Sequence, residues 1–86
     1  QKQKAAEYVG KVWKTASQYL SYYLSLDANR FAQAQNDCIR QIMIMQSTCE
    51  VASMVDQKTA KKYEDQLNKL YTLYHGRGGQ MPNAGN

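Results

Sequence analysis

Large apolar side chains are scarce in this chain. It has one phenylalanine, and alanine, methionine and tyrosine fill many of the apolar positions instead. Burial stabilises a fold by about 25 cal/mol per Å² of apolar surface, so alanine contributes less than leucine. With 86 residues the chain forms one domain, near the lower size limit for a self-sufficient core. We therefore expect modest stability alone and further stabilisation from an assembly.

Long apolar runs, proline and glycine are also rare. No apolar run reaches the roughly 18 residues that a transmembrane helix needs, which predicts no membrane span. The one proline and four of the five glycines follow residue 75. The composition thus divides the chain into a helical domain, residues 1–75, and a glycine-rich tail, residues 76–86. We expect such a tail to be flexible in solution unless a surface or a neighbouring subunit holds it.

Residues that carry chemistry are few. The chain has two cysteines and one histidine, His75, whereas structural zinc sites need four ligands, usually in closely spaced pairs. No carboxylate pair stands out, and no strand precedes the glycines at 76–79, so they do not form a phosphate-binding loop. We expect no catalytic residue, no metal and no cofactor.

An apolar stripe at helical spacing runs along most of the chain and changes phase twice. Its members are Ala5, Val9, Val12, Ala16, Tyr19, Tyr23 and Leu26, then Phe31, Ala34, Cys38, Ile42, Met45, Cys49 and Ala52, and finally Ala60, Tyr63, Leu67, Leu70 and Tyr74. Spacing of three and four residues places side chains on one helix face. Each change of phase predicts a break between helices.

The expected fold is all-α, a small three-helix bundle that runs up and down. The helices are predicted at about 2–24, 28–53 and 57–75, with Asp27 and Asp56 as N-caps of the second and third. Ile39, Met43 and Ile44 widen the stripe of the second helix, which is typical of a central helix. The alternative is a long helical hairpin in which the first two helices merge through a kink, because no glycine or proline enforces the first turn.

The two cysteines, Cys38 and Cys49, are eleven residues apart on one predicted helix face. On a straight helix their Cα atoms would be separated by about 16 Å, whereas a disulfide needs about 4.4–6.8 Å. Three possibilities stay open. The cysteines are core thiols, or they form disulfides between subunits, or the helix breaks and folds back between them.

Seven tyrosines and one tryptophan are a large aromatic content for this length. Tyr22 and Tyr23 point about 100° apart on a helix, so both cannot face one small core. Tyrosine is enriched at protein interfaces. We therefore expect Trp13, Tyr22 and Tyr71 on a partner-facing surface; the alternative is that such side chains surround the core with their polar ends in water.

The net charge of +4 favours anionic neighbours without specifying one. Tyr71, Tyr74 and Arg77, followed by glycines, resemble a surface that stacks bases and binds phosphate. A small basic nucleic-acid-binding protein is therefore the alternative function.

The preferred function is non-catalytic contact with another protein, or with copies of the chain itself. Trp13, Tyr22, Tyr71, Tyr74 and Arg77 are the candidate binding residues. The protein would be a structural subunit of a secretion, conjugation or virion assembly, or a small inhibitor or immunity-type binder. Because the chain starts at Gln1, we expect a secreted or periplasmic, envelope-associated location, with the cytoplasm as the alternative.

Overall fold

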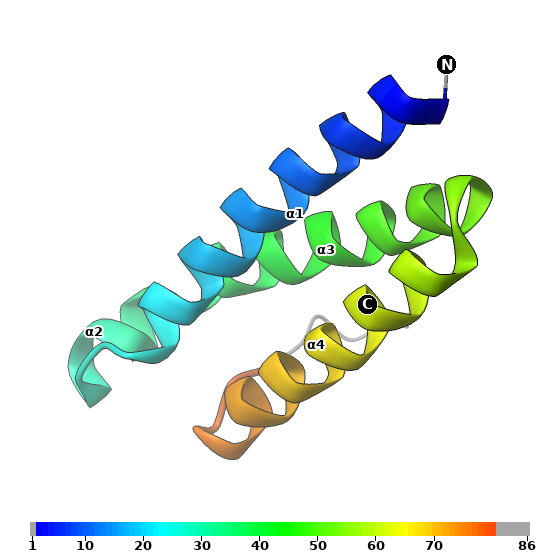
Figure 1. Ribbon diagram of the computed structural model, residues 1–86. Helices are drawn as coiled ribbons and strands as arrows, with labels where there is room; N and C mark the ends of the chain where they lie inside the picture. The colour runs from blue at the N-terminus through cyan, green and yellow to red at the C-terminus, as the bar shows by residue number, and fades with distance from the viewer. Residues whose placement is uncertain (1, 81–86) are drawn as a thin grey trace, which may run out of the picture.

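A computed structural model describes residues 2–80 of the chain, and these residues form four α-helices. The helices are α1 (Lys2–Leu24), α2 (Ala28–Gln33), α3 (Gln35–Val55) and α4 (Gln57–Gly76). The three long helices run alternately up and down, with the short α2 at the turn between α1 and α3 (Figure 1). Helix α3 is central and packs against both α1 and α4, which contact each other much less. The all-α bundle predicted from the stripe is confirmed.

Aspartate N-caps start two of the helices, as predicted. The Asp27 carboxylate accepts a hydrogen bond from the Arg30 backbone N–H at 3.0 Å, and Asp56 accepts one from Lys58 at 3.1 Å. Each bond satisfies a backbone donor that the first helical turn leaves without a partner. The turns therefore form without glycine or proline.

The second predicted helix, residues 28–53, is not continuous. At Ala34 the backbone has φ −97° and ψ 9°, and its N–H donates to both Arg30 and Phe31 carbonyls. This local tightening ends α2, and α3 begins at Gln35. No glycine or proline marks the position, so the sequence pattern does not reveal it.

The main core lies where all three long helices meet α2. Its buried side chains are Trp13, Ala16, Leu20, Phe31, Cys38, Ile42, Met45, Leu67 and Tyr74. Val9, Ala52 and Ala60 form a second, smaller cluster toward the turn between α3 and α4. Two of the three members of this cluster are alanines, which bury little area.

The described part of the tail, residues 77–80, turns back on the end of α4. Gly76 is the last residue of α4, and Gly78, with φ 86°, takes the left-handed conformation. The Gly79 N–H donates to the Tyr74 carbonyl, and the Gln80 N–H donates to the Gln35 side chain. The prediction of a flexible tail concerns mainly residues 81–86, which lie outside the described residues.

Candidate functional site

Trp13 is a core residue, so its predicted place on a partner-facing surface is wrong. Its ring is 5% exposed and stacks on Tyr63 of α4, with centroids 4.2 Å apart and planes 8° apart. Its indole N–H donates to the Gln66 side chain at 2.7 Å. Trp13 therefore joins α1 to α4 through an aromatic stack and a hydrogen bond.

Tyr74 and Arg77 also make contacts within the fold. Tyr74 is completely buried, packs edge-on against Phe31, and donates its hydroxyl hydrogen to the Gln80 carbonyl at 2.6 Å. The Arg77 guanidinium lies 4.3 Å from the Phe31 ring centre and donates to the Leu24 and Leu26 carbonyls. Arg77 thereby satisfies backbone acceptors at and just after the end of α1.

Tyr22 and Tyr71 are exposed, as predicted, at 59% and 38%. They belong to different helices and do not form one surface with the other predicted residues. Tyr22 lines a shallow groove along α1 with Thr15, Gln18 and Tyr19, whereas Tyr71 stacks on His75 of its own helix.

Both cysteines are free thiols on the continuous helix α3. The continuity of α3 excludes a fold-back between them and with it an intrachain disulfide. Cys38 is fully buried and Cys49 is half-buried. Burial is the main cause that raises the pKa of each thiol, with nearby Asp37 adding to it at Cys38 and Glu64 at Cys49. Both side chains thus behave as small core residues with low thiolate content.

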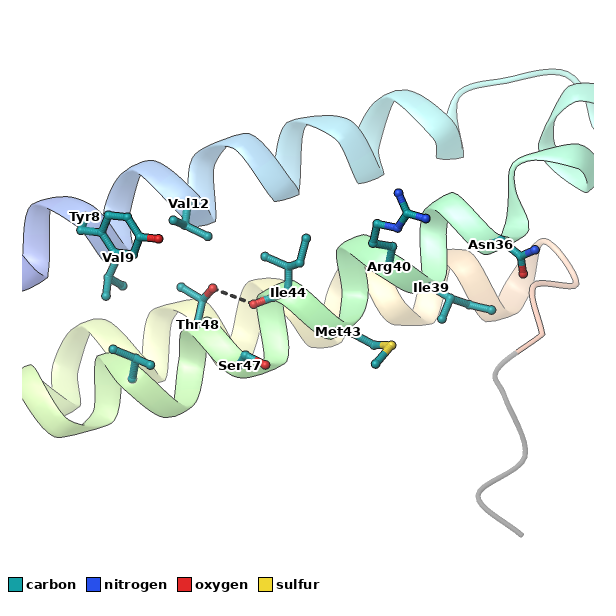
Figure 2. Close-up of a pocket in the computed structure, with 11 residues that line it drawn as sticks. Tyr8, Val9, Val12, Asn36, Ile39, Arg40, Met43, Ile44, Ser47 and Thr48 are labelled. Carbon is teal, nitrogen blue, oxygen red and sulfur yellow. Dashed lines mark hydrogen bonds between the residues drawn. The ribbon is translucent and has the colours of Figure 1, made fainter. Parts of the chain in front are cut away.

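The main candidate site is a groove between α1 and α3 with a volume of about 690 Å³. Its lining residues are Tyr8, Val9 and Val12 from α1, and Asn36, Ile39, Arg40, Met43, Ile44, Ser47, Thr48 and Val51 from α3. Figure 2 shows Val9 extending from α1 toward α3, with Tyr8 and Val12 beside it on the same helix. Residues of α3 line the groove along its whole length, whereas residues of α1 line one side of only part of it.

Apolar side chains dominate this groove, and several of them face solvent. Tyr8, Met43 and Val51 are 69%, 56% and 45% exposed, and Ile39 and Ile44 are half-buried behind them. The Thr48 hydroxyl does not offer a free donor, because it donates to the Ile44 carbonyl at 2.6 Å. A contiguous exposed apolar patch of this kind typically marks an interaction surface, whereas single exposed apolar residues do not.

The apolar face arises because the apolar residues of α3 are not confined to its buried side. Its buried side, with Cys38, Ile42 and Met45, packs in the core. Met43 and Val51 lie on another side, where an ordinary surface helix has polar residues. The sequence signal for the groove was therefore the wide stripe through Ile39, Met43 and Ile44, which predicted a central helix but not an uncovered side.

Positively charged side chains lie in the groove and beside it. Arg40 is its one charged lining residue, and Lys11 lines an adjoining groove that shares Val12 and Ile44. Lys4, Tyr8 and Lys11 follow i, i+4, i+7 spacing and so share one face of α1. Within residues 2–80 the ion pairs are Arg30–Asp27 and Lys61 with Glu64 and Asp65, so the cations beside the groove have no anionic partner there.

Two further findings concern residues 2–80. No three His, Cys, Asp or Glu side chains come close enough together to hold a metal ion. Every helix in this part of the chain is too short or too polar to cross a membrane.

Comparison with known proteins found no family model, no curated protein and no solved structure that matches the chain.

Proposed function

We propose that this protein is a non-catalytic, helical protein-interaction subunit that binds its partner through the α1–α3 groove. The observation that supports this most is the uncovered apolar side of the central helix, where Met43 and Val51 face solvent beside Tyr8. Completely burying one such side chain contributes roughly 1.5–3 kcal/mol, so covering several of them favours association. Tyrosine and methionine are also enriched in the centres of protein interfaces.

The groove replaces the set of binding residues predicted from sequence. Of that set, Tyr22 and Tyr71 have exposed side chains whose aromatic contacts are with residues of their own helices. Tyr22 continues the aromatic side of α1 beyond the groove, since Thr15 and Tyr19 line both adjoining grooves. We propose Tyr22 as a peripheral contact, and we propose no role in binding for Trp13, Tyr74 or Arg77.

An assembly subunit and a small inhibitor or immunity-type binder are two forms of this same function. A secreted or envelope-associated location stays a prediction from the sequence. We favour the nucleic-acid alternative less, because Tyr74 is buried and the Arg77 guanidinium donates to the Leu24 and Leu26 carbonyls.

The proposal is tested by two matched aspartate variants and purification from the native source under mild conditions. Met43→Asp places a charge in the groove, whereas Leu73→Asp changes a side chain of equal exposure on α4, 58% against 56%, away from the groove. We expect the first variant to lose the protein that co-purifies with the native chain and the second to retain it. Because both sites are exposed, both variants should keep the native helical content and melting temperature.

Co-purification that survives Met43→Asp would contradict the proposal. Recovery of nucleic acid whose binding weakens steeply with salt would support the alternative function, because counterion release gives that dependence.

A further inference from the structure

The shape of the α1–α3 groove fits an α-helix laid along it. On α3 the lining extends from Asn36 to Val51, which at 1.5 Å per residue is about 22 Å, or roughly four helical turns. Ile39, Met43 and Val51 repeat at multiples of four residues along this wall. Such a row accommodates the apolar i, i+3/i+4, i+7 face of an amphipathic helix.

An extended peptide strand is a poor alternative occupant. Strand addition requires an exposed sheet edge with unpaired backbone N–H and C=O groups. The walls of this groove are α1 and α3, whose backbone groups are hydrogen-bonded within each helix. Recognition at this site therefore depends on side chains.

The charges beside the groove are complementary to an acidic partner. On the α1 side the nearby cations are Arg40 from α3 and Lys4 and Lys11 from α1. The acidic residues of these two helices are Glu7 on α1, one turn before Lys11, and Asp37 and Glu50 on α3; all three lie outside the groove lining, so Arg40 is the charge that the groove itself presents. Carboxylates on the flank of a partner helix that faces α1 would therefore strengthen its binding.

A second copy of this chain is less favoured than an acidic partner. Each copy has a net charge of +4 and would bring the same Arg40 and Lys11 to the contact. Like charges that meet at an interface oppose association.

We propose that the groove binds an amphipathic α-helix of a partner protein, with an apolar face on Ile39, Met43 and Val51 and acidic residues on the flank toward Arg40 and Lys11. This inference rests on the proposed function and adds the chemical class of the partner.

Two designed peptides test the inference directly. Both have about 16 residues, enough to span the groove, with leucine at the same i, i+4, i+7 and i+11 positions, and they differ only in glutamate or lysine along one flank. Binding to the full chain is measured by fluorescence anisotropy. We expect the glutamate peptide to bind at least about ten-fold more tightly at low salt, with the difference shrinking as salt rises.

Variants of the chain show whether the groove causes this preference. Met43→Asp should weaken the glutamate peptide at least about ten-fold, and Leu73→Asp should leave it unchanged. The double variant Arg40→Glu, Lys11→Glu should reverse the preference in favour of the lysine peptide. Circular dichroism confirms that each variant has folded.

Each contrary result has a distinct meaning. Equal affinity for both peptides, or no binding of either, overturns the acidic helix as occupant, while the co-purification test of the groove stands separately. Dimerisation of the chain that Met43→Asp abolishes and Leu73→Asp does not would assign the groove to a second copy and likewise overturn the inference. Co-purification that survives Met43→Asp would instead overturn the proposed function itself.

Discussion

At the scale of single residues, two glycines show how differently the fold uses the same residue. Gly10 lies inside α1, where a Cβ atom would be 3.7 Å from the Tyr63 hydroxyl oxygen, an ordinary contact. Gly79 is buried, and a Cβ atom there would collide with the ring of Tyr74. Packing therefore tolerates a larger residue at position 10 but requires glycine at position 79.

Substitution by alanine should therefore have opposite effects at the two positions. Gly10→Ala should stabilise the fold by roughly 0.5–1 kcal/mol, because alanine has the higher helix propensity. For a domain of this size that raises the melting temperature by roughly 2–8 °C.

Gly79→Ala should lower the melting temperature, since the Tyr74 ring must move from the core. Thermal melts followed by circular dichroism check both, and a lower melting temperature for Gly10→Ala would show that Tyr63 cannot tolerate the added methyl group.

At the scale of elements, the junction between α3 and α4 depends on Asp56. The Thr59 hydroxyl donates to its carboxylate at 2.6 Å and the Lys58 backbone N–H at 3.1 Å. These hydrogen bonds, with that from Thr59 as the larger cause, lower the pKa of Asp56. A lowered pKa means that the charged carboxylate stabilises the fold above its unfolded pKa, near 3.9, and that this contribution is lost as the pH falls through the folded value.

Asp56→Ala should thus destabilise the protein at pH 7 and make little difference once the wild-type carboxylate is protonated. Urea unfolding at pH 7 and at a pH well below the lowered pKa of Asp56 measures both effects. Asp56→Asn is the control: it retains a good N-cap acceptor without the charge, so it should fall between wild type and alanine at pH 7. A destabilisation by Asp56→Ala that stays the same at both pH values would contradict the assigned role of the charge.

The sequence allowed prediction of elements where the physical cause is local. The phase of the stripe located the three long helices, and the short polar side chains of Asp27 and Asp56 identified the starts of α2 and α4, because N-capping involves neighbours in sequence. The break at Ala34 has no such local signal. The burial of Trp13 and Tyr74 and the backbone contacts of Arg77 have no local signal either, because they depend on residues of other elements, Tyr63, Phe31 and Leu24 among them.

At the scale of the whole molecule, the bundle leaves one side of its most apolar helix uncovered. Helices α1 and α4 cover two sides of α3, and the short α2 contacts it at one end (Figure 1). The sequence showed that α3 is apolar on a broad front, but which side stays open depends on how the helices pack against each other. The groove could therefore be found only from the three-dimensional arrangement, and it is the basis of the function we propose.

The most direct test of this account is to locate the partner's contact by site-specific photocrosslinking in the native source. A photoreactive phenylalanine analogue replaces Met43 in the groove or Leu73 on α4, two positions of nearly equal exposure. We predict a discrete protein adduct from position 43 and none of comparable yield from position 73. Equal adducts from both positions, or none from position 43 while position 73 reacts, would show that the α1–α3 groove is not the interaction surface.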